Sequence, residues 1–290
     1  MPDSVPIYQP AEMGTNALKR LGVALAERRS LGPDEQRMYE IFITDARNRV
    51  AVAQHVVQLA VAQLERVFSA VGEFEIVGRV KTRSTLSDKL ARTPAEKLPS
   101  IYDVAGIRVV HPGGLLAQQI VASTISSIMD DLPEVTRPSK VINRLESPMH
   151  GYRAVHLIIW PHGRPVEIQI RTELQHAWAQ VMELVGDRWG REPRYGLPVL
   201  CDDEAERERR QATVDSLVSF SALIAGHEKH VDGADLARLD LSPVADVLPD
   251  DLLHRVDHVR GAMRSLESQH VMGAAVLKEA LDQVRRGLEV

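Results

Sequence analysis

The feature that most constrains the fold is a pair of neighbouring segments in which apolar and polar residues alternate. They read YRAVHLIIW and VEIQIRT, at residues 152–160 and 166–172, and the turn PHGR lies between them. Alternation with a period of two is typical of a β-strand with one buried face. Two such strands across a short turn predict an antiparallel hairpin, so the core of the chain is expected to contain a sheet.

The predicted hairpin brings two polar rows together on one face. A loop with an even number of residues would pair His156 with Gln169, and directly opposed residues of antiparallel strands point to the same side. An odd loop would separate the two rows. With an even loop, one face carries Tyr152, His156, Glu167, Gln169 and Arg171. A polar row on a strand is ordinarily solvated, and two adjacent rows of this make-up leave a solvated face and a functional site both open.

The rest of the chain predicts an α+β fold, a mixed β-sheet flanked by helices. Helical spacing without internal Gly or Pro predicts one long helix, or two abutting helices, over 34–71. Further strands are expected at EFEIVGRV, at the end of PSIYDVAGIRVV and, more weakly, at EVTRPSKVI. Helices are expected at NALKRLGVALAERR, STLSDKLAR, 115–131, ELQHAWAQVMELVGDRW, about 203–230 and about 244–288. We expect a core at 72–190, between an N-terminal helical segment, 1–71, and a C-terminal helical extension, 191–290.

Composition and missing motifs narrow the function classes. A net charge of −5 argues against a general nucleic-acid coat protein, although a local basic patch remains compatible with it. The single cysteine excludes an internal disulfide framework and fits a reducing cytosol. We see no signal peptide and no apolar run of the roughly 20 residues that a membrane span needs. A cytoplasmic protein without membrane or DNA partners is expected, and Gly-rich phosphate loops and metal-spaced histidines are absent.

A basic cluster lies upstream of the hairpin, in GRVKTRSTLSDKLAR. Arg79 and Lys81 share one side of a strand end, and Lys89 and Arg92 share one face of the next helix. Cations of this kind can hold a triphosphate through charge-assisted hydrogen bonds, without a Gly-rich loop. The alternative is a basic, solvated helix face.

A carboxylate completes the candidate set. Asp103 directly precedes the strand AGIRVV, and Glu167 lies on the hairpin. Mg²⁺ is typically held by one or two carboxylates together with substrate phosphates and water. The pair would therefore suit a magnesium ion bound with a phosphorylated substrate.

Four segments together resemble the RelA/SpoT alarmone synthetase domain, in its order and at about its spacing. They are GRVKTRSTLSDKLAR, YDVAGIRVV, HGYRAVHLII and VEIQIRTELQHAWA, and the resemblance covers about residues 72–190. It implies a mixed sheet related to nucleotidyltransferases and transfer of the β,γ-pyrophosphate of ATP to a ribose 3′-hydroxyl. No His-Asp pair occurs, so the chain resembles a small member with synthetase activity alone.

The resemblance also implies roles for individual residues. The ATP-binding positions of the family match Arg79, Lys81, Lys89, Arg92 and Arg108. Asp103 matches the Mg²⁺ ligand, and Glu167 matches the carboxylate proposed as base for the 3′-hydroxyl, also near the metal. Tyr152 matches the tyrosine that stacks on the acceptor base. The remaining acceptor-side positions match His156, Gln169, Arg171 and His176.

The chain departs from the family on the acceptor side. Ser147 and Pro148 stand where the family often has a lysine that helps bind the phosphates of GDP or GTP. His150 precedes the glycine where Asn or Ser is frequent, and His176 stands where small synthetases often have Asn. The donor side and both carboxylates are retained.

Three functions therefore remain open. The first is synthesis of (p)ppGpp from ATP and GDP or GTP. The second is toxic pyrophosphorylation of the tRNA 3′ end, for which Arg137, Lys140 and Arg144 could grip the backbone. The third is an inactive member used as a binding module. The C-terminal helices could bind tRNA, form a homo-oligomer or neutralise the enzyme, and an antitoxin protein is a further candidate partner.

Overall fold

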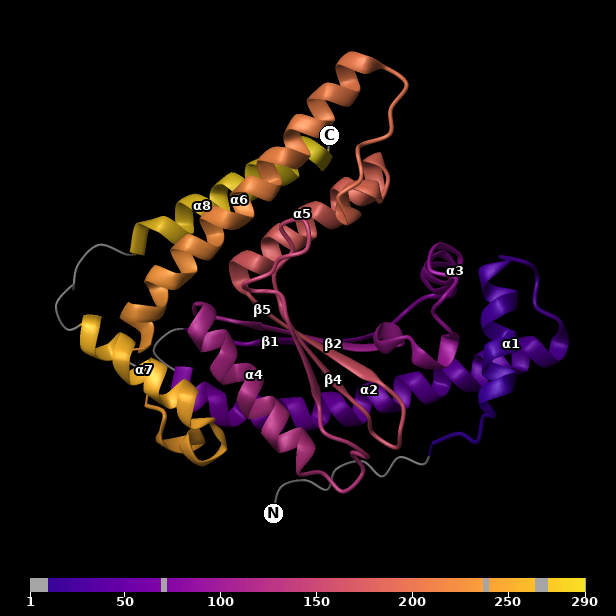
Figure 1. Ribbon diagram of the computed structural model, residues 1–290, viewed down its shortest axis with the longest axis horizontal. Helices are drawn as coiled ribbons and strands as arrows, with labels where there is room; N and C mark the ends of the chain where they lie inside the picture. Colours follow the sequence, from indigo (N-terminus) through magenta and orange to yellow (C-terminus); the bar gives the residue numbers. More distant parts are fainter. Residues whose placement is uncertain (1–9, 69–71, 237–239, 264–270, 290) are drawn as a thin grey trace.

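A single five-stranded sheet lies at the centre of the computed structural model, which describes residues 10–68, 72–236, 240–263 and 271–289 (Figure 1). The strand order is β1-β2-β5-β4-β3. The strands are β1 Glu75–Val80, β2 Ala105–His111, β3 Lys140–Asn143, β4 Val155–Ile159 and β5 Val166–Thr172. Only the β2–β5 pair is parallel. The sheet is therefore mixed, as predicted.

Eight α-helices occur in the described part of the chain. They are α1 Thr15–Ala26, α2 Pro33–Phe68, α3 Arg83–Arg92, α4 Leu115–Asp130, α5 Glu173–Trp189, α6 Glu204–Leu236, α7 Asp250–Met263 and α8 Val271–Glu289. Short 3₁₀ turns lie at Leu98–Ser100, Tyr102–Val104, Glu192–Tyr195 and Ser242–Val247. Helix α5 begins at a capping box, in which the Thr172 hydroxyl accepts from the Gln175 amide. This helix coincides with the predicted segment ELQHAWAQVMELVGDRW.

Helices α2 and α4 cover one face of the sheet (Figure 1). The apolar members of the alternating strands point to these helices, and Ile107, Ile168 and Leu157 are buried there. Fully burying one such side chain stabilises the fold by about 1.5–3 kcal/mol. Because the alternation has a period of two, the polar members of the same strands are left on the opposite face.

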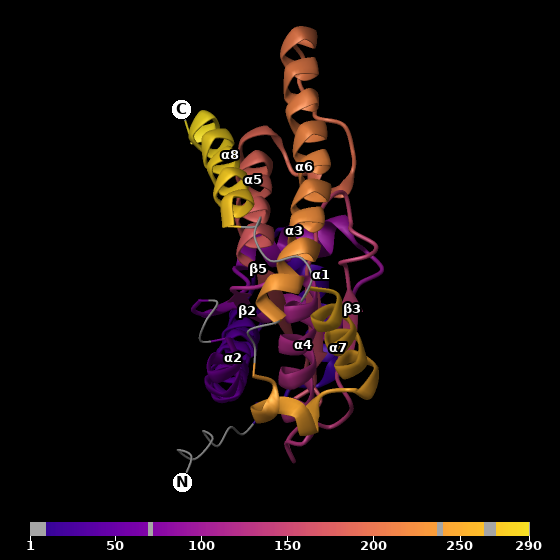
Figure 2. The ribbon, with the colours of Figure 1, turned by 90° about the vertical axis from the view of Figure 1, so that its left-hand side faces the viewer.

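Helices α5, α6 and α8 form an arm that extends away from the sheet (Figures 1 and 2). Their apolar faces make a second core, which includes Trp178, Val185, Leu217 and Leu281. Residues of α1 and α2 belong to the first core, together with the strands. The division of the chain at residues 72 and 191 stays a prediction.

The C-terminal helices differ from the predicted ones. Helix α6 runs on to Leu236, beyond the expected end near residue 230. The single helical stretch expected over 244–288 is divided into Ser242–Val247, α7 and α8. Pro249 stands between Ser242–Val247 and α7. Proline lacks the N–H that a continuing helix needs, so the helical stretch is interrupted there.

Smaller differences concern element ends. The long helix expected over 34–71 is one helix that ends at Phe68, and residues 69–71 lie outside the described residues. The weak strand predicted in EVTRPSKVI is limited to Lys140–Asn143, after Pro138. In the described ranges, no helix has both the length and the apolar content that a membrane crossing needs.

Candidate active site

The register of the β4–β5 hairpin is the one that an even loop predicts. His156 pairs with Gln169 and Ile158 pairs with Glu167. The ladder ends at the pair Val155 and Ile170, so Arg171 lies one residue beyond the pairing with β4. The predicted gathering of polar side chains on the face opposite α2 and α4 is confirmed by their contacts.

Five side chains on this face form a closed ring of hydrogen bonds. On one side of the ring, Arg171 Nη2 donates to the Tyr152 hydroxyl at 2.9 Å. The Tyr152 Oη and His156 Nε2 atoms are 2.9 Å apart, and His156 Nδ1 lies 2.8 Å from Glu167 Oε1. An ionised carboxylate can only accept a hydrogen bond, so His156 Nδ1 carries the proton that faces Glu167.

The other side of the ring passes through Gln169. Arg171 Nη2 donates to Gln169 Oε1 at 3.1 Å, and Gln169 Nε2 donates to Glu167 Oε2 at 2.8 Å. Both carboxylate oxygens of Glu167 therefore accept a hydrogen bond. A ring closed by five hydrogen bonds holds each member in one orientation.

The carboxyl group of Glu167 is ionised despite its burial. Burial by itself would raise its pKa, but the hydrogen bond and charge of His156 and the hydrogen bond from Gln169 outweigh burial and the repulsion by Asp103. The pKa of Glu167 therefore lies below its ordinary value. An ionised carboxylate can accept a proton or bind a cation.

Asp103 lies between two lysines. Lys81 Nζ is 2.6 Å from Asp103 Oδ2, and Lys89 Nζ is 3.0 Å from Asp103 Oδ1. The antiparallel pairing of β1 with β2 brings them together, because Val80 pairs with Ala105 and Lys81 N donates to the Val104 carbonyl. Burial would raise the pKa of Asp103, yet the attraction of both lysines keeps that pKa below its ordinary value.

Arg79 and Glu167 lie in one row of the sheet, on either side of Gly106. Gly106 pairs with Arg79 on β1 and with Glu167 on β5. A Cβ atom at Gly106 would stand 3.6 Å from the Glu167 carbonyl oxygen and 3.8 Å from Arg79 Cγ. Since glycine has no side chain, Gly106 places none between the cation and the carboxylate. Sequence reasoning missed this role of Gly106, although the residue begins the segment GIR.

Arg108, Arg171 and His176 lie close to one another on the same side of the sheet as this row. Burial and the charges of both arginines lower the pKa of His176 to about 4. The Nε atoms of both arginines and Nδ1 of His176 are buried without a hydrogen-bond partner. Unpaired buried polar groups are costly, so this corner suits a ligand that offers acceptor atoms to the arginines.

Arg92 lies apart from the carboxylates. Its guanidinium is 4.5 Å from the ring centroid of Tyr195, in the segment after α5. Lys89, by contrast, contacts Asp103 from the same helix. The contact between Arg92 and Tyr195 joins α3 to the arm, and no local sequence pattern predicts it.

A cluster of cations on aromatic rings borders Asp103. The Tyr102 and Trp160 rings meet edge to face, with centroids 6.2 Å apart. Arg137 lies 3.8 Å from the Trp160 centroid, and Lys140 lies 5.5 Å from the Tyr102 centroid. Arg137 and Lys140 were predicted from the sequence as candidate contacts, whereas Tyr102 and Trp160 were not. Such pairs suit stacking and phosphate contacts with a nucleotide chain.

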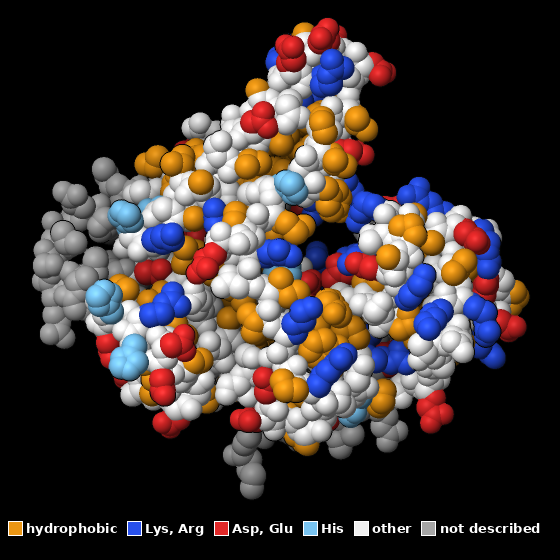
Figure 3. Space-filling model, in the orientation of Figure 1, with side chains coloured by type: hydrophobic (Ala, Val, Ile, Leu, Met, Phe, Trp, Pro, Cys, Tyr) orange, Lys and Arg blue, Asp and Glu red, His pale blue; other side chains and the backbone are white. Residues whose placement is uncertain are grey.

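Charged side chains gather in a hollow between the arm of α5 and α6 and the lobe of α1 and α3 (Figure 3). Within the described residues, no group of three or more His, Cys, Asp and Glu side chains is arranged to hold a metal ion. The two carboxylates Asp103 and Glu167 nevertheless fit the oxygen donors that Mg²⁺ prefers, if substrate phosphates supply the rest.

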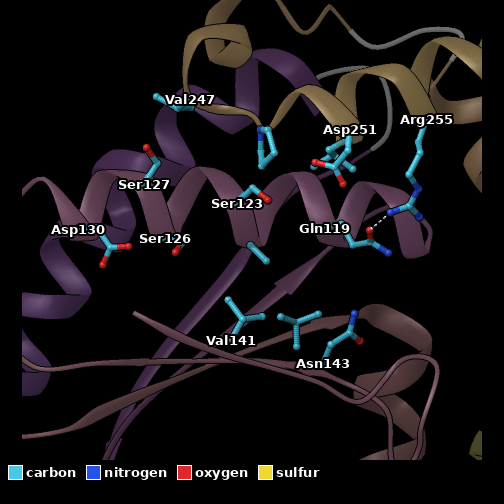
Figure 4. A pocket seen from close by; sticks show the side chains of 14 residues that line it. Gln119, Ser123, Ser126, Ser127, Asp130, Val141, Asn143, Val247, Asp251 and Arg255 are labelled. Atoms are coloured by element: carbon cyan, nitrogen blue, oxygen red, sulfur yellow. Dashed lines mark hydrogen bonds between the residues drawn. The ribbon is translucent and has the colours of Figure 1, made fainter. Parts of the chain in front are cut away.

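A separate pocket of about 410 Å³ lies on the helix-covered side of the sheet (Figure 4). Helix α4, strand β3 and helix α7 contribute its walls. Gln119 and Arg255 are joined across it by a hydrogen bond of 2.7 Å (Figure 4). The pocket shares no residue with the charged face.

The part of the sequence that forms most of the sheet and its charged face is similar to known proteins. Residues 78–184 match the model for the region found in RelA / SpoT proteins. An uncharacterized protein of Mycobacterium tuberculosis is 34% identical over 194 residues, which are 66% of this chain and 65% of that protein. The chain thus spans less than two thirds of the length of that relative. A guanosine-3′,5′-bis(diphosphate) 3′-pyrophosphohydrolase of Vibrio cholerae is 25% identical over 50% of this chain and 19% of that enzyme.

Two solved structures are similar at lower identity. The small alarmone synthetase 1 from Bacillus subtilis bound to its product pppGpp is 18% identical, with a TM-score of 0.46 over 67% of this chain and 98% of that chain. A GTP pyrophosphokinase family protein from Streptococcus pneumoniae is 17% identical, with a TM-score of 0.44 over 68% of this chain and 96% of that chain.

Proposed function

Residues 78–184 of this chain are a RelA/SpoT region, as its motifs predicted, and on this premise we propose that the protein is a pyrophosphokinase. It transfers the β,γ-pyrophosphate of ATP to the ribose 3′-hydroxyl of GDP or GTP and makes (p)ppGpp. The observation that carries this proposal is the placement of ionised Glu167 close to Asp103, with Lys81 and Lys89 beside them.

The cations beside Asp103 and Glu167 bind the triphosphate of ATP. Lys81 and Lys89 have Asp103 as their partner in the structure, and phosphate oxygens compete for the same ammonium groups. Asp103 and Glu167 would hold Mg²⁺ alongside these oxygens, and the bound ion would neutralise charge that develops on them. Gly106 places no side chain between Arg79 and Glu167, where the phosphates would lie.

Glu167 accepts the proton of the 3′-hydroxyl. The O3′ atom then forms a bond to the β-phosphorus of ATP, the bond from that phosphorus to the α,β-bridging oxygen breaks, and AMP leaves. Transfer of this kind depends mostly on positioning and on charge stabilisation, which fixed side chains supply. The hydrogen-bonded ring holds Glu167 in position through His156 and Gln169.

The acceptor base lies at the Tyr152 end of the ring. Arg171 already lies 5.0 Å from the centroid of the Tyr152 ring, so a stacked base would have to share the ring with this guanidinium. His156, Gln169 and His176 complete the acceptor side. Aromatic stacking on a base is worth about 1–3 kcal/mol.

A tRNA 3′ end is the alternative acceptor, and one cluster favours it. Arg137 on Trp160 and Lys140 on Tyr102 border Asp103, and they suit the backbone and bases of a single strand. The segment that contains Ser147 and Pro148 also lacks the lysine that would bind the phosphates of a free nucleotide. An acceptor without a 5′-diphosphate needs no such lysine.

The test is to incubate the protein with β-labelled ATP and Mg²⁺, together with either GDP and GTP or bulk tRNA. Label on a guanosine nucleotide is expected, and label on tRNA alone would favour the alternative. Glu167→Gln and Asp103→Asn are expected to lower transfer at least a hundredfold, since each removes a charge that acts on the reacting oxygens. Exposed Glu208→Gln on α6 is the matched control and should be fully active.

Transfer to neither acceptor by the folded wild-type protein would contradict the proposal and leave a binding module. Near-full activity of folded Glu167→Gln would contradict the placement of the base. Circular dichroism of each variant separates loss of chemistry from loss of structure.

A further inference from the structure

Helix α6 contacts the RelA/SpoT region through one continuous stripe. Leu217, Ser221, Glu228 and Asp232 are spaced by four, seven and four positions, so they lie on one side of the helix. The Leu217 carbonyl accepts from the Trp178 indole at 2.7 Å. Ser221, Glu228 and Asp232 are all buried. The stripe is therefore polar as well as buried, which gives the docking of α6 a defined register.

Two members of the stripe bind the starts of other helices. Asp232 accepts from Leu116 N at 2.7 Å and from Ala117 N at 3.2 Å, at the beginning of α4. Glu228 accepts from the hydroxyl of Thr172, which caps α5, and from Gln175 Nε2 at 3.0 Å. Carboxylates are favoured at helix N-termini, so these contacts hold the lower part of α6 against the sheet.

Ser221 binds the loop that carries Tyr152. Its hydroxyl donates to the Gly151 carbonyl, and Arg153 Nε donates to the same hydroxyl at 3.3 Å. Arg153 also donates through Nη1 to the Leu145 carbonyl. Ser221 and Arg153 therefore clamp the loop on both sides of Tyr152.

Gly151 packs tightly against α5 and α6. Its φ of +84° lies in the left-handed region, and a Cβ atom there would come within 2.8 Å of Trp178 and 3.3 Å of the Val218 backbone. Tyr152 follows directly, and its backbone exchanges two hydrogen bonds with Met149, of 2.9 and 3.2 Å. The position of α6 thus sets the position of the Tyr152 backbone.

We propose that α6 completes the acceptor side of the active site and that Ser221 is a positioning residue for Tyr152. The inference rests on the proposed pyrophosphokinase function for its kinetic consequence, but the clamp itself does not depend on the reaction. Through Tyr152, the clamp reaches the ring that holds Glu167. Lys81 and Lys89 contact Asp103, whereas Ser221 and Arg153 bind on either side of Tyr152, so the clamp is expected to act on the acceptor rather than on ATP.

The test compares Ser221→Ala with Ser219→Ala in the 290-residue chain. Ser219 is exposed on the same helix, and its hydroxyl bonds to the Asp215 carbonyl within the helix, so it is a matched control. Hydrogen exchange is measured first, without substrates. The Met149 and Tyr152 amides are expected to exchange faster in Ser221→Ala and at the wild-type rate in Ser219→Ala.

Kinetics are measured next, with the acceptor that the wild-type protein uses. In Ser221→Ala, KM for the acceptor should rise about tenfold, the effect of losing one hydrogen bond of about 1.4 kcal/mol. KM for ATP should stay unchanged. Ser221→Thr keeps the hydroxyl and should restore both the exchange rate and KM. If Ser221→Ala does not fold, Arg153→Gln removes the other part of the clamp and is tested in the same way.

Unchanged exchange at Met149 and Tyr152 in folded Ser221→Ala and Arg153→Gln would overturn the inference. Equal increases in KM for ATP and for the acceptor would also overturn it, because they indicate a general loss of structure. Faster exchange in a protein whose wild type transfers no pyrophosphate would support the clamp and reject the proposed function instead.

Discussion

At the scale of single residues, the pairing of each buried charge determines what it can do. Glu167 and Asp103 stay ionised because donors surround them, from His156 and Gln169 in one case and from two lysines in the other. His176 stays neutral because burial and the charges of two neighbouring arginines lower its pKa to about 4. The same face therefore offers one carboxylate that can take a proton and another whose two lysine partners can also bind the phosphates of a substrate.

His156→Ala tests how Glu167 is kept ionised. The variant removes the Nδ1 donor, so the pKa of Glu167 should rise from its lowered value. A carboxylate base is active only when ionised, so the acid limb of the pH profile of kcat/KM should move to higher pH. Loss of a hydrogen bond to a charged group costs about 1.5–3 kcal/mol, so activity at neutral pH should fall about ten- to a hundredfold.

Exposed His254→Ala on α7 is the control for this measurement and should keep the wild-type profile. An acid limb at the wild-type position in His156→Ala would show that His156 does not control the ionisation of Glu167.

At the scale of elements, the strands were predictable where alternation and turn length fix the register. The polar rows of β4 and β5 met as expected because the intervening loop is even, which is a local property of the chain. Lys81 and Asp103 were identified as candidates, but their contact needs the antiparallel pairing of β1 with β2. The docking stripe of α6 was not predictable, because Ser221 binds a carbonyl 70 positions away and resembles any polar helix residue in the sequence.

Gly106→Leu tests the open row between β1 and β5. Alanine at this position makes only ordinary contacts, at 3.6 and 3.8 Å, so Gly106→Ala should fold and bind ATP like the wild type. A leucine side chain would project into the space between Arg79 and Glu167. Affinity for ATP, measured by calorimetry, should fall at least tenfold, equivalent to about 1.4 kcal/mol.

Gly287→Leu on α8, where nothing lies near the added carbon, is the control and should bind ATP normally. Normal ATP affinity in folded Gly106→Leu would place the triphosphate elsewhere on the sheet.

At the scale of the whole molecule, each C-terminal helix packs against α4 or α5, which themselves contact the sheet. Helix α6 binds the starts of α4 and α5, α7 packs beside α4 at the pocket of Figure 4, and α8 packs on α5. Removal of α6 would leave the beginnings of two helices without their acceptors. The extension is therefore structurally continuous with the candidate active site, and its stability should influence binding of the proposed acceptor.

Glu228→Gln tests the pH dependence of this junction. The pKa of Glu228 is raised to about 7, because burial and the charge of Asp232 outweigh the hydrogen bonds from Thr172 and Gln175 and the charge of Arg153. Because the folded state holds this proton more tightly than the unfolded state, the wild-type protein should lose stability as pH rises from the ordinary glutamate pKa of 4.5 to about 7. The slope approaches about 1.4 kcal/mol per pH unit.

The free energy of unfolding in urea, measured from pH 5 to pH 8, checks this expectation. Glu228→Gln cannot titrate at this position, so its profile should lack the wild-type decrease and it should be the more stable protein at pH 8. Exposed Glu208→Gln on the same helix should follow the wild-type curve. Parallel wild-type and Glu228→Gln curves would mean that Glu228 keeps an ordinary pKa in solution, which requires a junction more open to water than the buried contacts with Thr172 and Gln175 allow.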